Sequence, residues 1–261
     1  MLSGTCGSGT VFFGNCNMRC VYCQNYQISQ APEIQRQYEV DTSFLAERLI
    51  YLQDELKCHN INFVSPSHFV PQIVRAVLEA VPLGLRLPLV YNSSGYDSVK
   101  TLRELDGIIS IYLPDLRYAS NEMGRKYSRV RNYRESSRAA IKEMYRQVGN
   151  LEVDGEDIAW KGLIVRHLIL PNRIAGSEDS LGWLAHDISP SVTVSIMSQY
   201  FPTHRAGRYP LLARKILPGE YMEVVRLIEK LGLENGWVQE MASAEHYLPD
   251  FSSKEPFSAR G

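Results

Sequence analysis

Residues 9–26 read GTVFFGNCNMRCVYCQNY, and the interpretation of the whole chain starts from this stretch. The apolar run at 9–14 predicts a β-strand. The loop that follows it carries Cys16, Cys20 and Cys23 in the spacing C-x3-C-x2-C. In folds built from alternating strands and helices, active sites gather at the carboxyl ends of the strands. We therefore expect a functional site at these three cysteines.

The spacing of the three cysteines favours an iron–sulfur cluster. Three thiolates can hold one corner of a cuboidal cluster and leave one iron open for a substrate or cofactor. A structural zinc site uses four ligands, and no fourth Cys or His follows at zinc-finger spacing; a zinc knuckle or a group of buried thiols is the alternative. Cys58 ends the apolar stripe of a predicted helix and is expected in the core. Cys6 has no assigned role.

The composition is that of an ordinary globular chain. Apolar residues make up 44% and charged residues 22% of its 261 residues, which excludes collagen-like and disordered classes. The 28 basic and 29 acidic residues give a net charge of -1, so binding to nucleic acid through bulk charge is not expected. Residues 1–13 show no signal peptide, and no apolar run approaches the roughly 18 residues of a spanning helix. We expect a soluble cytoplasmic protein without membrane contact.

Strand and helix patterns alternate along the chain. Apolar, β-branched runs predict strands at 9–14, 60–64, 88–92, 107–113, 162–170, 192–197 and 237–240. Helical periodicity predicts helices at 42–57, 70–81, 98–105, 134–148, 177–186 and 219–231. Strands joined by helices pair in parallel through right-handed crossovers, so an incomplete barrel and an open doubly wound sheet both fit this pattern.

Local signals add to this prediction. Ser177 is expected to cap its helix, and Gly232 is expected to end the last one. Residues 117–134 are rich in Arg and Tyr and are predicted to form a surface loop, with recognition of an anionic substrate or partner as its alternative role. Residues 1–246 are expected to form a single domain, and 247–261 a tail that is poorly ordered or lies over the surface.

The cysteine motif resembles that of a known superfamily. C-x3-C-x2-C after the first strand, with Tyr22 just before the last Cys, is similar to the radical S-adenosylmethionine (SAM) superfamily. The longer string GSGTVFFGNCNMRCVYCQNYQISQ, residues 7–30, resembles the pyruvate formate-lyase-activating-enzyme-like branch, and the likeness runs to about residue 240. The resemblance implies a partial (β/α)6 barrel of the TIM type. It also implies a [4Fe–4S] cluster held by the three cysteines, with SAM chelating the open iron.

The resemblance assigns SAM contacts to the ends of the second and third strands. Ser65 and Ser67 stand in the loop where the family carries a Gly-Gly-Glu-like motif, and their hydroxyls replace that contact to the SAM amino group. Asn92 and Ser94 stand at the strand end that faces the ribose in the activating enzymes. An amide both donates to and accepts from ribose hydroxyls, with a simple turn role as the alternative for Asn92.

The later strands supply the remaining contacts that the resemblance implies. Asp115 and Arg117 match the family's Asp-Leu-Lys and would hold the methionyl amino group and carboxylate, with a strand-end salt bridge as the alternative. Arg166 on the fifth strand would point to SAM or to the barrel interior. His204, in the loop after the sixth strand, would pack near the adenosine. His167 should point away from Arg166 and is expected in the core.

The activity implied by the resemblance is reductive cleavage of SAM. One electron from a donor such as flavodoxin or ferredoxin yields methionine and a 5′-deoxyadenosyl radical, which abstracts a hydrogen from the substrate. The nearest substrate is a glycyl residue of a partner enzyme, as for the activating enzymes. Another protein, an RNA or a small metabolite is the alternative. A non-catalytic iron–sulfur or zinc protein is the alternative of a different class.

Overall fold

The computed structural model describes residues 1–31, 38–241, 249 and 251. Its strands form one sheet in the order β1-β2-β3-β4-β6-β7-β8, in which all neighbours are parallel, and β5 lies off this path and pairs antiparallel with β6. The strand bounds are β1 Gly9–Phe12, β2 Ile61–Val64, β3 Leu89–Asn92, β4 Ile111–Tyr112, β5 Glu152–Val153, β6 Ala159–Leu168, β7 Thr193–Met197 and β8 Gly236–Val238.

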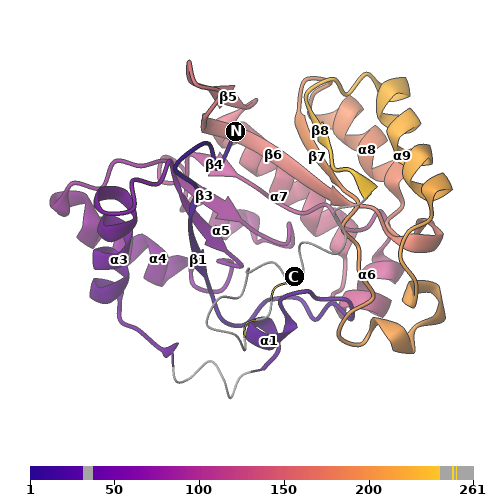
Figure 1. Ribbon diagram of the computed structural model, residues 1–261, viewed down its shortest axis with the longest axis horizontal. Coiled ribbons are helices and arrows are strands. Elements are labelled where there is room, and N and C mark those ends of the chain that lie inside the picture. The colour runs from indigo at the N-terminus through magenta and orange to yellow at the C-terminus, as the bar shows by residue number, and fades with distance from the viewer. Residues whose placement is uncertain (32–37, 242–248, 250, 252–261) are drawn as a thin grey trace.

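Helices connect these strands and lie outside the sheet (Figure 1). The helix bounds are α1 Tyr26–Ser29, α3 Thr42–Asp54, α4 Val70–Ala80, α5 Val99–Arg103, α6 Asn121–Ser128, α7 Tyr133–Val148, α8 Ser177–Trp183 and α9 Pro218–Leu231. Short helical turns are η2 Val81–Leu83, η3 Pro171–Arg173, η4 Leu184–Ile188, η5 Ala206–Arg208 and η6 Pro210–Leu212. Figure 1 shows α3 and α4 beside the first strands and α8 and α9 beside the last ones.

The two faces of the sheet have different neighbours, which identifies the architecture. The outer face packs against the helices in one large core that includes Phe63, Tyr91 and Tyr112. The inner face holds a small separate cluster formed by strand residues, namely Val90, Ile111, Leu113, Ala159 and Ile164, against which Leu2 and Leu151 pack. A doubly wound sheet has helices on both faces, whereas a barrel encloses its inner face. The predicted partial (β/α)6 barrel is therefore confirmed.

The parallel register determines which side chains share the barrel interior. Val64 pairs with Asn92, and an isolated bridge joins Asp115 to Arg166 beyond the end of β4. Successive side chains on a strand alternate between the two faces. Asp115 and Arg166 therefore lie on the same face as Leu113 and Ile164, two residues nearer the carboxyl end. This end of the interior is polar, whereas the cluster below it is apolar.

Several local predictions were wrong. The region 117–134 is not a loop, because it contains α6, whose Gly124, Tyr127 and Ser128 are buried. Its Ser120 hydroxyl accepts a hydrogen bond from the Glu122 N–H and so caps this helix.

Two further predictions concerned secondary structure near residues 107–113 and 177. The strand predicted at 107–113 is confined to β4, since 107 and 108 belong to a turn and the buried Ile109 lies outside any strand. The cap of α8 is Gly176, not Ser177. Gly232 does end α9, in the left-handed conformation expected for a helix C-cap.

The structure describes residues 249 and 251 of the predicted tail. Most of 247–261 lies outside the described residues. The Phe251 ring packs edge-on against Phe12 at the end of β1, with ring centroids 5.3 Å apart, and its N–H donates to Gln27. Within the described ranges, no helix combines the length and apolar character needed to cross a membrane.

Candidate active site

The cysteine loop is held in place by backbone hydrogen bonds to two distant segments. The Arg19 N–H donates to the Ser128 carbonyl at 2.9 Å, and the Val21 N–H donates to the Tyr127 carbonyl at 2.8 Å. On its other side, the Arg205 N–H donates to the Val21 carbonyl at 2.8 Å. The loop carrying Cys20 therefore lies between the end of α6 and the segment after β7.

Each cysteine sulfur has a polar neighbour. The Ser128 hydroxyl donates to Cys20 Sγ at 3.0 Å, the Ser29 hydroxyl lies 3.2 Å from Cys23 Sγ, and the Met18 N–H donates to Cys16 Sγ at 3.4 Å.

The protonation of two of these cysteines is altered by their surroundings. Burial raises the pKa of Cys16 to about 11 and also raises the pKa of Cys23, and the positive charge of Arg117 partly offsets both effects. Metal binding requires thiolates, so this nearby cation favours the form that a cluster needs.

The donor chemistry of the loop fits a cluster with an open iron. Three thiolates, and no carboxylate or imidazole, project from residues 16–23. Among the described residues, no three His, Cys, Asp or Glu side chains are placed to hold a single metal ion. In a four-iron cluster each thiolate binds a different iron, so the sulfurs need not converge on one point. Cys16, Cys20 and Cys23 are therefore the residues that would hold the cluster.

A charged network lies at the carboxyl ends of β3, β4 and β6. Asp115 bridges two guanidinium groups, because Arg166 Nη2 lies 2.8 Å from Asp115 Oδ1 and Arg117 Nη2 donates to Asp115 Oδ2. Arg166 Nη2 also donates to Asn92 Oδ1 at 2.6 Å. The structure thus brings together Asn92, Asp115, Arg117 and Arg166, which sequence reasoning placed on three separate strand ends.

This network retains hydrogen-bonding capacity. In the described part of the chain, the buried Nε atoms of Arg117 and Arg166 have no hydrogen-bond partner. Buried donors without partners are costly unless a ligand or water satisfies them. Two guanidinium donors and a carboxylate suit a ligand that carries both a carboxylate and an amino group, as the methionyl part of SAM does.

Buried tyrosines fix the backbone beneath this network. The Tyr133 hydroxyl accepts from the Arg117 N–H at 2.8 Å and donates to the Asp115 carbonyl at 3.1 Å. Gly95 packs against the same carbonyl, where a Cβ would collide with the oxygen. Its positive φ of 72° also favours glycine. The loop after β3 therefore approaches Asp115 more closely than any larger residue would allow.

The three serines assigned to SAM differ in their surroundings. Ser94 Oγ donates to Asn17 Oδ1 at 3.1 Å and so ties the loop after β3 to the cysteine loop. Ser65 has a left-handed backbone with φ of 59° and donates its N–H to the Asn92 carbonyl. Ser67 Oγ donates to the buried Asp97 at 2.6 Å, so this hydroxyl is already occupied.

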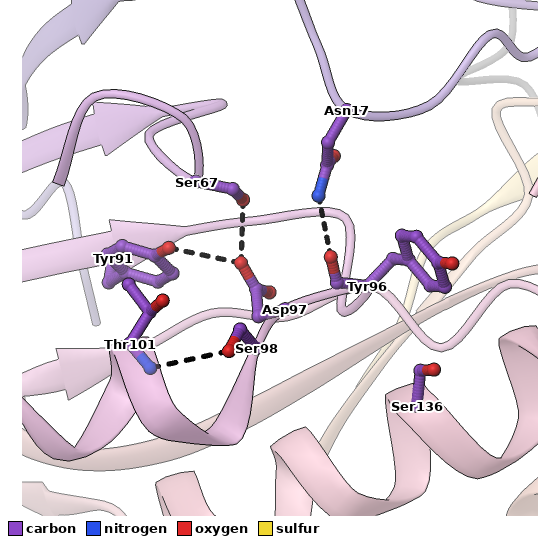
Figure 2. A pocket seen from close by; sticks show the side chains of 8 residues that line it. All are labelled: Asn17, Ser67, Tyr91, Tyr96, Asp97, Ser98, Thr101 and Ser136. Atoms are coloured by element: carbon purple, nitrogen blue, oxygen red, sulfur yellow. Dashed lines mark hydrogen bonds between the residues drawn. The ribbon is translucent and has the colours of Figure 1, made fainter.

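A separate cavity of 360 Å³ lies between the cysteine loop and the helices behind β3 (Figure 2). Its lining is rich in hydroxyl groups and consists of Asn17, Ser67, Tyr91, Tyr96, Asp97, Ser98, Thr101 and Ser136. Asp97 accepts hydrogen bonds from Ser67, Tyr91 and Ser93. Burial raises the pKa of Asp97, and these three donors oppose the effect. Asp97 is therefore held in place by three donors from the protein itself.

Tyr22 and His204 occupy different environments. Tyr22 is buried next to Cys23, and its hydroxyl lies 2.6 Å from the Tyr118 hydroxyl, which in turn lies 2.7 Å from Ser128 Oγ. His204 is exposed and stacks on Tyr26 with ring centroids 4.7 Å apart.

The histidines differ in their hydrogen-bond partners. Arg205 Nε donates to His204 Nε2 at 2.9 Å. His167 is fully buried, as predicted. His68 Nε2 lies 2.8 Å from the Gly14 carbonyl at the start of the cysteine loop.

Sequence reasoning missed residues that lie around Cys20 and the Asp115 network. Ser128 contacts Cys20, Tyr118 contacts Ser128, and Tyr133 contacts the Asp115 carbonyl. All three come from 117–134, which the sequence predicted as a surface loop. A helical period was present there, since Gly124, Tyr127 and Ser128 share one buried face. Asn17 was also missed, although its neighbour Cys16 was identified; its amide N–H donates to the Tyr96 carbonyl at 2.6 Å.

A barrel with three cysteines after its first strand and a charged network at the ends of its strands defines an enzyme built around an iron–sulfur cluster. The profile of the radical SAM superfamily matches residues 10–158, more than half of the chain. The protein belongs to the radical SAM superfamily. Its cofactors are accordingly a [4Fe–4S] cluster and SAM, and the alternative of a zinc protein falls away.

The chain also has a relative of moderate sequence identity. The chain is 30% identical over 234 residues to the uncharacterized protein MJ0674 of Methanocaldococcus jannaschii, and this match covers 87% of the chain and 63% of the relative. The chain thus spans less than two thirds of that relative's length.

Solved structures share the fold at low sequence identity. Streptococcus suis SuiB bound to its precursor peptide SuiA has a TM-score of 0.58 and 11% identity, covering 94% of this chain and 52% of SuiB. Methylornithine synthase PylB has a TM-score of 0.53 and 14% identity, covering 97% of this chain and 75% of PylB. The enzyme anSMEcpe with bound AdoMet has a TM-score of 0.53 and 10% identity, covering 85% of this chain and 60% of anSMEcpe.

Proposed function

We propose that this radical SAM enzyme abstracts a hydrogen atom from a protein-borne substrate, with a glycyl residue of a partner enzyme as the first candidate. Once reduced by one electron, the cluster supplies the cleavage of SAM to methionine and a 5′-deoxyadenosyl radical. The observation that supports the SAM chemistry is the Asp115 network at the same barrel end as the cysteine loop, in which the Nε atoms of Arg117 and Arg166 have no partner among the described residues.

In this proposal each residue of the network binds a different part of SAM. Arg117 and Arg166 offer their free Nε donors to the SAM carboxylate. Asp115 accepts from the amino group and keeps both guanidinium groups in place. Asn92 uses its remaining N–H donors on the ribose, with Ser94 beside it. Tyr22, Ser65, Ser67 and His204 belong to this assignment through family resemblance, and Ser67 and His204 have protein partners that a SAM contact would have to displace.

The resemblance of residues 7–30 to the activating-enzyme branch supports a glycyl substrate. A protein substrate also needs access to the barrel interior from the side. In the described residues, β1 and β8 are the two edges of the sheet and do not pair with each other, so the barrel is not closed there. Another protein, an RNA or a small metabolite is the competing substrate. SuiB, one of the structural neighbours, is bound to a precursor peptide.

The reductant in this proposal is a one-electron carrier such as flavodoxin or ferredoxin, which places the enzyme in the reducing environment of the cytoplasm. The first test is anaerobic reconstitution with iron and sulfide, followed by dithionite and SAM. We expect a brown protein that absorbs at about 400 nm and forms 5′-deoxyadenosine. A reconstituted cluster that forms none would overturn the enzyme assignment in favour of a non-catalytic iron–sulfur protein.

The second test concerns the substrate. Candidate substrates deuterated at the position of abstraction are incubated with the reduced enzyme and SAM. The true substrate raises the yield of 5′-deoxyadenosine and transfers deuterium into it. A partner protein labelled at glycine is the expected donor. Deuterium transfer from a small metabolite or an RNA, and none from labelled protein, would reject the activase-like function and leave the radical chemistry intact.

A further inference from the structure

Six cations cluster around the cysteine loop. They come from three segments: Arg19 from the loop itself, Arg125, Lys126 and Arg129 from the end of α6, and Arg205 and Arg208 from the segment after β7. The backbone hydrogen bonds at Arg19, Val21 and Arg205 hold these three segments side by side. We refer to these six residues as the basic collar.

Further contacts join the two outer parts of the basic collar. Lys126 Nζ lies 5.3 Å from the centre of the Tyr127 ring, and that ring packs edge-on against Tyr209 at 5.6 Å. Tyr209 follows Arg208 directly, so the cations of α6 and of the later segment lie on neighbouring surface. Figure 1 shows α6 beside the orange segment that follows β7. Burial lowers the pKa of His204, and the positive charges of Arg205 and Arg208 lower it further.

Among the residues that the structure describes, the collar is not neutralised locally. Residues 1–32 contain no Asp or Glu, residues 197–219 contain none, and residues 118–134 contain one, Glu122, against five cations. Within the described residues, none of the six collar cations forms an ion pair, whereas Arg117, Arg146, Arg166 and Arg214 do. The chain as a whole has a net charge of -1. This local excess of positive charge is therefore a specific feature of the surface next to the cysteines.

We propose that the basic collar is the docking surface for an acidic one-electron carrier protein. The inference rests on the proposed function in one respect, since that function requires an external electron. In the docked complex the carrier loses one electron and the cluster gains it, and no bond forms or breaks. Complementary charge accelerates such encounters and orients the partners.

The same cations do not suit a nucleic acid as well. Proteins that bind single strands combine cations with exposed aromatic rings on which bases stack. The tyrosines interleaved with the α6 cations point inward: Tyr127 and Tyr133 are buried, with 1% and 0% of their surface exposed. The exposed His204 ring beside Arg205 is already stacked on Tyr26. The α6 part of the collar thus offers charge without a stacking surface, which favours an acidic protein.

The test compares two variants with the same change in net charge. The collar variant is Arg125→Gln/Lys126→Gln/Arg208→Gln. The control variant, Lys100→Gln/Arg226→Gln/Lys230→Gln, removes three exposed cations elsewhere on the molecule. Each reconstituted protein is titrated with oxidised flavodoxin, an acidic carrier, and the dissociation constant is measured between about 0.02 and 0.5 M salt.

We expect the collar variant to bind flavodoxin about tenfold more weakly than the wild type at low salt and to lose most of the salt dependence. The control variant should stay within about twofold of the wild type. The rate at which reduced flavodoxin reduces the cluster should follow the same order. Equal losses in both variants, or unchanged binding in the collar variant, would overturn the proposal.

Two further arms separate this proposal from others. Dithionite needs no docking, so dithionite-driven cleavage of SAM should be equal in all three proteins. Its failure in the wild type would reject the proposed function while the flavodoxin titration still decides the docking surface. Single-stranded RNA is titrated in parallel. Salt-dependent RNA binding that the collar variant loses, with flavodoxin binding unaffected, would reassign the collar to nucleic acid.

Discussion

Arg166 and His167 are neighbours on β6, but their side chains lie on opposite faces of this strand and have different surroundings. Arg166 points into the barrel interior, where it contacts Asn92 and Asp115, and its Nε has no partner in the described structure. His167 is fully buried on the opposite face. Its Nδ1 lies 2.7 Å from the Leu116 carbonyl and its Nε2 lies 2.9 Å from the Ser177 hydroxyl.

The difference separates polar groups that stabilise the fold from those available to a ligand. Both nitrogens of His167 are satisfied by the protein, so its removal should affect folding first. Arg166 and Arg117 retain buried donors, so their removal should affect SAM binding first. The predictions below test this distinction between the outer face and the interior, and they begin with the largest expected effect.

Cys20→Ala should abolish the function of the interior site. Removing one of three thiolates should lower the amount of bound iron. The yield of 5′-deoxyadenosine should fall by about a thousandfold or more. Iron analysis and chromatography of the nucleoside measure both. The matched control is Cys6→Ala, because Cys6 is exposed and outside the motif. A Cys20→Ala protein with full iron content and normal turnover would contradict the cluster assignment.

His167, on the outer face, should make the stability of the fold depend on pH in the acid range. Burial lowers the pKa of His167 to about 4, against the opposing effects of the Leu116 carbonyl and Asp115. The unfolded chain has a His pKa of about 6.5, so it binds more protons than the native state in this range. The free energy of unfolding should therefore fall as the pH drops below about 6.5 and level off near about 4, by up to about 3 kcal/mol.

Urea unfolding across this pH range checks the acid effect. His167→Asn should lower stability at neutral pH and remove this part of the pH dependence, while SAM binding by the folded protein is unchanged. The control, His186→Asn, alters an exposed histidine and should retain the wild-type profile. If the two variants show the same profile, His167 is not the responsible group.

Asp115→Asn should weaken SAM binding by about tenfold to a hundredfold, because the amide does not neutralise the guanidinium groups of Arg117 and Arg166. Equilibrium dialysis with SAM measures the change. Ser177→Ala, on the outer face, is the matched control and should cost about 1 kcal/mol of stability with no change in SAM affinity. Unchanged SAM affinity in Asp115→Asn would place SAM elsewhere.

Ser128→Ala should have the smallest effect of these variants. It tests whether a hydrogen bond to Cys20 tunes the reduction potential of the cluster. The Ser128 hydroxyl donates to Cys20 Sγ, and such a bond favours the more negative, reduced state of a cluster. We expect the midpoint potential to become more negative by about 30 mV, which is less than 1 kcal/mol for one electron. Ser137→Ala, a buried serine of α7, should leave the potential unchanged. A shift in Ser137→Ala of equal size would refute a specific role for Ser128.

Much of the fold was predictable because strand and helix periods are local signals. The helix predicted at 42–57 and the helix observed at Thr42–Asp54 begin at the same residue, after the Asp41 side chain that caps it. α6 was missed because its exposed Arg and Lys residues outweigh a short buried face. The start of β4 was predicted too early, at residue 107 instead of Ile111, because buried apolar residues before a strand and within it look alike in sequence.

The sequence by itself determined three features: the cysteine spacing, the alternation of strands and helices, and the polar residues at strand ends. Each of them depends on residues close together in the chain. Only the tertiary structure decided which of these residues meet. Parallel register brings Asn92, Asp115 and Arg166 together from strands far apart in sequence. The burial of α6 places Ser128 on Cys20, 108 residues away. Contacts of this kind depend on how whole helices and strands pack against one another, so a local sequence pattern does not predict them.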